Sequence, residues 1–419
     1  MNTRAMLFVA IGVGALTLPA LASDWPQWRG PHRDGISPEK GLLQEWPKEG
    51  PQLLWQRKDL GDGYSTPAVV GERIYLLSNK GMDNEFVQAL DVKDGIQVWA
   101  TRLGKVGPNQ GPQYPASRST PTVDGEMLFA LGSDGDLACL ETATGKLRWQ
   151  KNLRAEFGGK PGAWAYSESP LVDGETLVCT PGGSQATLVA LNKKSGDLLW
   201  KVPLPEGSQA GYASVVAAEV GGVRQYIQAL EKGVIGVEAK TGKLLWQSDV
   251  TTKGSPAVIP TPVVQGDLVY SSGARVGGGL LQIKPGGDGF QAVSVYNSAK
   301  LPTAIGGTVL IGDYLYGTTG QALICVDFKS GTIKWSDRSI GTSSLCYADG
   351  RLYLHGENGD LALVEATPEG YREKGRFKPV DPPNRGRSRA WSYPVIANGR
   401  LYIRDLGVLW CYNVKSAAS

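Results

Sequence analysis

The sequence predicts an all-β fold, an eight-bladed β-propeller with four-stranded blades. Three observations lead to this prediction. A hairpin unit that ends in tryptophan recurs at spacings of 44 to 51 residues, a period typical of propeller blades. A second apolar run, which follows a turn, occurs eight times. The two ends of the chain carry incomplete sets of strands that together complete the last blade.

The hairpin unit consists of two apolar residues, an acidic residue or asparagine, a glycine four positions on and a tryptophan eight positions on. The polar side chain bonds the backbone of the turn, and glycine supplies the positive φ that the turn needs. An alternating strand then follows. We expect each tryptophan to end that strand and to dock in the core against the neighbouring sheet. These tryptophans are Trp55, Trp99, Trp149, Trp200, Trp246 and Trp335.

The number of blades follows from two counts, of the less regular hairpin units and of the apolar runs that follow a turn. Trp246 and Trp335 lie about two periods apart, so a degenerate unit is expected at Leu280 to Val293, and another at Leu361 to Phe377. The apolar run that follows a turn occurs eight times, which indicates eight blades. These runs begin near Arg73, Glu126, Glu175, Val223, Asp267, Asp313, Arg351 and Arg400.

The last blade should be closed by both ends of the chain. An N-terminal strand at about 51–57 has no partners before it, and the C-terminal strands at about 391–414 lack a fourth. Pairing the two removes free sheet edges and ties the termini together.

The first residues are typical of a secretory signal peptide. Arg4 precedes an apolar run at 5–18, and Ala20-Leu21-Ala22 fits the cleavage site. No other apolar stretch approaches the roughly 20 residues of a membrane span, and no cysteine stands at the cleavage point for a lipid anchor. We therefore expect an exported, soluble protein, periplasmic or extracellular, without membrane insertion. The expected segments are a signal peptide at 1–22, an N-terminal extension at 23–50 and the propeller at 51–419.

Composition excludes several classes of function. The net charge is +3 with 20% charged residues, which gives no basic surface for nucleic acid. Five cysteines occur without a C-x-x-C motif, so they are expected to be buried thiols rather than metal, haem or disulfide ligands. The two histidines, without a G-x-S-x-G or H-E-x-x-H motif, predict no hydrolytic centre. We expect no catalytic residue and no metal ligand.

Ligand groups in a propeller converge where the loops between blades meet over the central channel. Arg118 and Glu168 begin the inner strands of consecutive blades, so they either neutralise each other across the channel or contact a ligand. Trp164 and Trp391 stand outside the docking unit and are candidates for ligand contact. The candidate ligand-binding residues are Arg118, Ser119, Trp164, Tyr166, Glu168, Tyr212, Arg275 and Trp391.

The hairpin unit, over residues 51 to 414, resembles the tryptophan-docking repeat of quinoprotein dehydrogenases and of the propeller lipoprotein of the outer-membrane β-barrel assembly machine. The chain is more closely similar to exported PQQ-like β-propeller repeat proteins. Their mature start resembles Asp24 to Pro31, and they share the segments Arg118 to Gly125 and Tyr166 to Gly174.

The resemblance to quinone enzymes implies features that this sequence lacks. Such enzymes commonly carry an adjacent cysteine pair and long insertions that bury the quinone, whereas this chain has no adjacent cysteines and little length beyond eight blades. No cofactor is therefore expected, with pyrroloquinoline quinone and Ca²⁺ as the alternative.

The leading hypothesis is an exported binding or scaffold protein of the cell envelope, which acts as a monomer. Its partner is a protein or a small polar or anionic ligand on the loop-rich face. One alternative is an oxidoreductase of the quinone-dependent type with a reduced cofactor site. Another is a scaffold for outer-membrane protein assembly.

Overall fold

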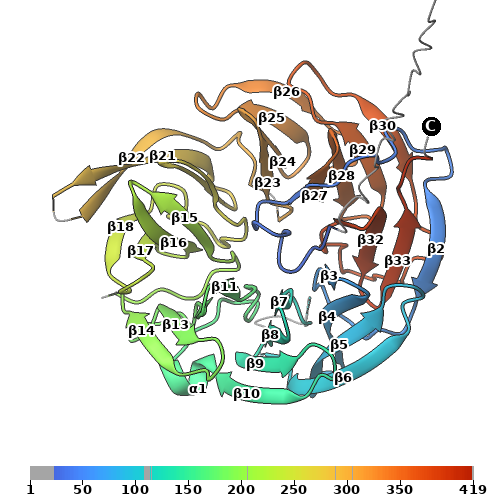
Figure 1. Cartoon of the computed structure of the whole chain (residues 1–419). Coiled ribbons are helices and arrows are strands. Elements are labelled where there is room, and N and C mark those ends of the chain that lie inside the picture. The colour runs from blue at the N-terminus through green and yellow to red at the C-terminus, as the bar shows by residue number, and fades with distance from the viewer. Residues whose placement is uncertain are drawn as a thin grey trace, which may run out of the picture.

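A ring of eight four-stranded sheets surrounds a central axis in the computed structural model, which describes residues 23–107, 114, 116–204, 206–287, 289–303 and 305–417 (Figure 1). The predicted all-β, eight-bladed propeller with four-stranded blades is confirmed. One short helix, α1 (Leu153–Phe157), occurs in these ranges. The predicted signal peptide at 1–22 lies outside the described residues.

Each of the first four blades is an antiparallel meander that runs from the axis outward. The first contains β3 (Ala68–Val70), β4 (Arg73–Lys80), β5 (Asn84–Asp91) and β6 (Gln97–Gly104). The second contains β7 (Thr122–Asp124), β8 (Met127–Leu131), β9 (Asp136–Glu141) and β10 (Leu147–Asn152). The third contains β11 (Leu171–Asp173), β12 (Thr176–Cys179), β13 (Leu188–Asn192) and β14 (Leu198–Val202). The fourth contains β15 (Val216–Val220), β16 (Val223–Leu230), β17 (Gly233–Glu238) and β18 (Leu244–Ser248).

The fifth to seventh blades repeat this order, and the seventh gains a fifth strand. The fifth contains β19 (Val263–Gln265), β20 (Leu268–Gly273), β21 (Gly277–Gly286) and β22 (Gly289–Ser298), and its long outer hairpin projects beyond the ring (Figure 1). The sixth contains β23 (Thr308–Ile311), β24 (Tyr314–Thr318), β25 (Leu323–Asp327) and β26 (Ile333–Asp337). The seventh contains β27 (Ser343–Ala348), β28 (Arg351–Gly356), β29 (Leu361–Glu365) and β30 (Glu373–Phe377), with β1 (Ile36–Ser37) parallel to β27.

The eighth blade joins the two ends of the chain, as predicted. It contains β31 (Val395–Ala397), β32 (Arg400–Asp405), β33 (Val408–Asn413) and, as the outer strand, β2 (Gln52–Arg57). Leu53 stands opposite Tyr412, and Arg57 opposite Leu409. The inner strand begins at Val395 rather than near 391, because the preceding residues form a lead-in to the strand.

Neighbouring blades are linked by the repeat tryptophans, whose indole N–H groups donate to a backbone carbonyl of the next blade. The glycine of each turn permits the contact: a Cβ on Gly145, which has a φ of 71°, would lie 2.4 Å from the Trp99 ring. The hydrogen bonds are Trp55 to Val92 at 3.0 Å, Trp99 to Thr142 at 3.0 Å, Trp149 to Lys193 at 3.0 Å, Trp200 to Ala239 at 3.1 Å and Trp335 to Thr367 at 2.7 Å.

Trp246 packs in the core against the fifth blade as predicted, in one cluster with Val269 and Leu281, but its indole makes no hydrogen bond to the described backbone of that blade. Its indole donates at 2.7 Å to Gln225 Oε1 within its own blade, because the fifth blade has no acidic-glycine turn to receive it. In the fifth blade Tyr296 stands opposite Leu280, the place that Trp149 holds opposite Cys139. The Tyr296 hydroxyl donates to Phe328 O of the sixth blade at 2.7 Å.

The seventh blade has a glycine, Gly375, at the tryptophan position opposite Leu363. Trp46 of the N-terminal extension fills that space, since a Cβ on Gly375 would lie 2.5 Å from the Cβ of Trp46. The Trp46 ring lies 5.9 Å from Tyr353, as Trp335 lies 6.1 Å from Tyr316. The extension therefore supplies from outside the repeat the aromatic ring that this blade lacks.

The N-terminal extension also fills the axial channel. We call residues 25–37 the channel plug, and Figure 1 shows the blue segment reaching from the rim into the centre of the ring. Trp25 exchanges two backbone hydrogen bonds with Val69. Across the axis, Arg33 donates to Ser169 O and Pro170 O, and Arg29 to Thr308 O. The plug thus binds the inner strands of blades on opposite sides of the ring.

The five cysteines are all buried and unpaired, which confirms their predicted role as packed thiols. Among the described helices, none is long and apolar enough to cross a membrane.

We expect Trp46→Ala to lower the free energy of unfolding by about 3–5 kcal/mol, the usual cost of emptying a buried tryptophan site. Trp46 is 5% exposed. Urea unfolding followed by circular dichroism measures this change. Leu54→Ala on β2, where the side chain is 41% exposed, is the control and should cost less than about 1 kcal/mol. Equal losses in the two variants would contradict the role assigned to Trp46.

Candidate functional site

A cavity of about 290 Å³ opens where the loops between blades meet over the axis. Seven of the eight blades contribute an equivalent wall residue, which stands three or four positions before the inner strand at the start of a lead-in, as in Arg118-Ser119-Thr120-Pro121 and Trp391-Ser392-Tyr393-Pro394. The seven residues are Tyr64, Arg118, Ser167, Tyr212, Ile259, Ile305 and Trp391. The wall is completed by Trp28, Tyr114, Trp164, Ala257 and Tyr393.

Hydroxyl groups hold these lead-ins in register with one another. Ser169 Oγ accepts the Thr120 N–H at 2.8 Å, and Ser214 Oγ accepts the Ser169 N–H at 2.9 Å. Between the last and first blades, Thr66 Oγ1 accepts the Tyr393 N–H at 2.9 Å. These bonds fix neighbouring lead-ins to one another, and the first residues of the lead-ins line one cavity.

The channel plug closes the inner end of the cavity. Trp28 lies 4.6 Å from Tyr393 between ring centroids, in an edge-on contact, and its indole N–H donates to Thr261 Oγ1 at 2.9 Å. A second cavity, of about 340 Å³, lies toward the opposite end of the channel, with His32 and Asp34 of the plug and Gln265 and Gly312 of the blade turns among its lining. The first cavity is therefore a blind pocket.

Aromatic contacts brace the wall. Trp391 packs on Tyr64 and on Tyr114, with ring centroids 5.0 and 4.7 Å apart, and its indole N–H donates to Glu357 Oε1 at 2.8 Å. Trp164 packs on Tyr212 at 5.8 Å and is 36% exposed at the rim. These rings form an apolar surface whose positions are fixed by their mutual packing.

Arg118 is the one charged residue among the described wall residues. Its guanidinium donates to Ala116 O at 3.2 Å, to Trp164 O at 3.0 Å and to Tyr114 O, and it lies 5.5 Å from the Tyr64 ring. Burial lowers the pKa of Arg118. The expected mutual neutralisation of Arg118 and Glu168 does not occur, because Arg118 is bound by backbone carbonyls instead.

Glu168 and Tyr166 lie behind the wall. Glu168 accepts the Thr180 N–H at 2.7 Å and the Gln228 Nε2 donor at 3.0 Å, and burial raises its pKa to about 7. The Tyr166 hydroxyl donates to Pro181 O at 2.7 Å. Both side chains pack in the interior instead of reaching the cavity wall.

The eight predicted site residues therefore separate into two groups. Arg118, Trp164, Tyr212 and Trp391 meet at the cavity. The other four do not line it: Ser119, Tyr166 and Glu168 are buried in the interior, and Arg275 occupies a turn between β20 and β21 with a φ of 66°.

Sequence reasoning missed several wall residues. Tyr64, Ile259 and Ile305 hold the same place in their lead-ins as Arg118, so aligning the lead-ins would have found them. Trp28 and Tyr393 come together only because the plug enters the channel. No pattern in the sequence signals that contact.

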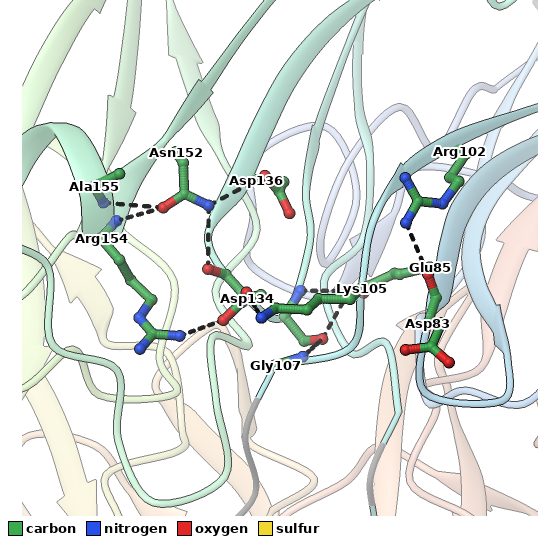
Figure 2. A network of polar contacts seen from close by, with 11 residues as sticks. Asp83, Glu85, Arg102, Lys105, Gly107, Asp134, Asp136, Asn152, Arg154 and Ala155 are labelled. Atoms are coloured by element: carbon green, nitrogen blue, oxygen red, sulfur yellow. Dashed lines mark hydrogen bonds and ion pairs between the residues drawn. The ribbon is translucent and has the colours of Figure 1, made fainter.

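A second polar cluster lies between the first and second blades (Figure 2). Glu85 of β5 is buried, and its Oε2 accepts both the N–H and the hydroxyl of Ser133, at 2.8 and 2.7 Å. Its Oε1 has no hydrogen-bond partner among the described residues. Burial raises the pKa of Glu85 to about 7.

Asp134 and Asp136 of this cluster are occupied by other side chains. Asp134 pairs with Arg154 and, at 3.6 Å, with Lys105, while Asn152 donates to Asp136 at 3.1 Å (Figure 2). In the part of the chain that the structure describes, no group of three or more His, Cys, Asp or Glu residues could hold a metal ion.

The fold and the site define a class of protein: an eight-bladed propeller whose channel is closed by its own N-terminal segment and opens at one face as an aromatic pocket. The chain belongs to the family described as outer membrane protein assembly factor BamB, whose model matches residues 36–163 and 84–337. This confirms the predicted kinship with PQQ-like repeat propellers.

Individual comparisons agree with this membership. Outer membrane protein assembly factor BamB of Burkholderia pseudomallei (strain K96243) is 25% identical over 300 residues, which cover 61% of this chain and 72% of the relative. The crystal structure of BamB from Moraxella catarrhalis matches 89% of this chain and 100% of its own, with a TM-score of 0.61 and 13% identity. A europium-containing methanol dehydrogenase matches 91% of this chain and 89% of its own, with a TM-score of 0.63 and 12% identity. The two structural likenesses show the fold.

The described residues do not fit a quinone cofactor with its cation. Pyrroloquinoline quinone carries three carboxylates and works beside a cation held by carboxylate and amide groups. The described cavity wall offers one guanidinium and no carboxylate. No chemical step through that cofactor follows from this site.

We expect the free energy of unfolding to fall as the pH rises from about 4.5 to about 7. The folded protein retains a proton on Glu85, whose raised pKa is about 7, whereas the unfolded chain releases it at the ordinary value of 4.5. Each unit of pKa difference is worth about 1.4 kcal/mol. Urea unfolding at pH values between about 4 and 8 should show a smaller fall for Glu85→Gln, because the amide binds no proton in this range. Its oxygen can still accept from Ser133, so the variant should fold.

Glu168, with its pKa also raised to about 7, should preserve part of the fall in that variant. Glu72→Gln, on an exposed turn, is the control and should follow the unaltered protein. Identical pH profiles for Glu85→Gln and Glu72→Gln would refute the assignment to Glu85.

Proposed function

We propose that this chain is a binding scaffold of the bacterial cell envelope, which holds a partner protein at its loop-rich face with the aromatic cavity as the contact point. The observation that carries the proposal is the construction of the cavity. One residue from each of seven blades, together with Trp28 of the plug, forms a single pocket at that face. Clustered tryptophan and tyrosine side chains in a pocket are the kind of surface that contributes most to binding energy.

The relatives support the setting of this function. The family and the Burkholderia relative are named for outer membrane protein assembly. We therefore propose that the chain acts in the assembly or maintenance of the envelope, which agrees with the signal peptide predicted at 1–22.

The chemistry of the cavity wall favours binding over catalysis. Its titratable groups are tyrosines and Arg118. Burial raises the pKa of Tyr64, Tyr212 and Tyr393, so these hydroxyls hold their protons more firmly and are poorer proton-transfer groups. His355 does not line the cavity but is buried behind its wall, with Nδ1 2.9 Å from Ser392 O. The site supplies surface and charge for recognition, and fold alone assigns no reaction.

We expect a photo-crosslinking residue at position 164 to capture a partner protein in the host bacterium. p-Benzoylphenylalanine in place of Trp164 would stand at the exposed rim of the cavity. The matched control places it at Gln265, the exposed last residue of β19 beside the second cavity. Adducts detected by mass spectrometry should form from position 164 and not from position 265. Equal capture from both positions, or none from 164, would be incompatible with a partner at the loop-rich face.

A further inference from the structure

Arg118 carries a positive charge that forms no direct ion pair with any described acidic side chain, although the buried Glu85 acts on it through space. Its hydrogen bonds to described residues all go to backbone carbonyls, and no described carboxylate lies within ion-pair distance of it. Three carbonyls hold the guanidinium, but they carry only partial charges. A half-buried cation without a counter-ion is costly, so this geometry is complementary to an anion that enters from the cavity.

The guanidinium also retains free donors. Its recorded hydrogen bonds run from Nη1 and Nη2 to Ala116, Trp164 and Tyr114. No described residue accepts from Nε, so the edge formed by Nε and Nη2 can donate two parallel hydrogen bonds to one carboxylate.

The backbone that fixes the guanidinium is itself held in unusual conformations. Tyr114 has a φ of 75°, and Ala165, directly after Trp164, has a φ of 64°. Side-chain-bearing residues adopt this left-handed region only at a cost, and such residues gather at ligand clamps. Here the two residues flank the carbonyls that orient Arg118.

The rest of the cavity wall is mainly aromatic and aliphatic, with the hydroxyl groups of Ser167 and the tyrosines as its other polar groups, and its aliphatic residues lie across the axis from Arg118. Arg118 belongs to the second blade, and Ile305 to the sixth, which is diametrically opposite in an eight-bladed ring. Ile259 and Ala257 adjoin Ile305, while the Trp391 and Trp164 groups of rings lie on either side of Arg118. A ligand that spans the pocket would place its charge at the second blade and its apolar body toward the sixth.

We propose that the cavity binds an aromatic carboxylate, a ligand that joins one flat ring system to a single carboxylate held by Arg118. This inference rests on the proposed function and deepens it. The volume of about 290 Å³ admits one ring system with one carboxylate. Two sources share that chemistry: a free aromatic acid, and the aromatic carboxy-terminal residue of a polypeptide.

Calorimetric titration of the purified full exported chain tests the ligand class, with N-acetylphenylalanine and its carboxamide as probes. The free acid should bind at least about tenfold more tightly than the amide. Arg118→Met should abolish that preference, whereas Arg102→Met, an exposed arginine on β6, should leave it intact. Equal affinity for acid and amide in the unaltered protein would overturn the proposal, as would an undiminished preference in Arg118→Met.

A second variant guards against misfolding of Arg118→Met. Ile305→Trp fills the apolar end of the cavity while leaving Arg118 in place, and it should weaken binding of the acid and the amide alike by about tenfold or more. Unchanged binding in this variant would show that the probe sits elsewhere and would also overturn the proposal.

Hexapeptides that end in phenylalanine, with a free or an amidated terminus, distinguish the two sources. Binding of the free-terminus peptide about tenfold tighter than N-acetylphenylalanine indicates a chain terminus, and equal binding indicates a free acid. Crosslinks from position 164 without any preference for the acid would leave the scaffold function standing and remove the ligand. A preference for the acid without crosslinks from position 164 would leave the ligand standing and remove the scaffold function.

Discussion

The space along the axis is the constraint on which this molecule depends. Eight sheets arranged in a ring leave a channel between their inner strands, and the backbone groups that line it need hydrogen-bond partners. The chain fills it with residues 25–37, and the guanidinium groups of Arg29 and Arg33 satisfy carbonyls on opposite sides of the ring. The same segment gives the cavity its inner end through Trp28. The binding site and the stability of the ring therefore share one element.

Each contact described between neighbouring blades places a flat ring between their sheets, and different residues supply that ring. Most blades donate an indole N–H to a carbonyl of the next blade, as Trp99 does to Thr142. The fifth blade uses the hydroxyl of Tyr296 instead. At the seventh blade the ring of Trp46 occupies the site from outside the repeat, and Leu43 N–H of the same segment donates to Val414 O of the eighth blade at 2.8 Å. In the fourth blade the ring of Trp246 also packs between sheets, although its indole donates within its own blade. What the fold preserves is a flat ring between sheets, rather than a particular residue or hydrogen bond.

The repeat made the fold predictable, including the shared eighth blade, because strand number and order are carried by short-range patterns around each turn. The site was predictable only in part. Arg118, Trp164, Tyr212 and Trp391 stand out as large or charged residues near inner strands, and the structure brings them together. Glu168 stands out equally, yet its side chain turns into the interior toward Thr180 and Gln228. The contact of Trp28 with Tyr393 joins residues from opposite ends of the chain, and no local pattern encodes it.

The repeated origin of the cavity wall has a consequence for how such a pocket can change. Each of the seven equivalent wall residues, from Tyr64 to Trp391, comes from a different blade and stands ahead of a strand rather than within it. One codon per blade can therefore alter the chemistry of the pocket while the sheets keep their registers. A ring of this kind offers independently variable positions around one opening, so that natural divergence or directed evolution can produce new recognition by combination.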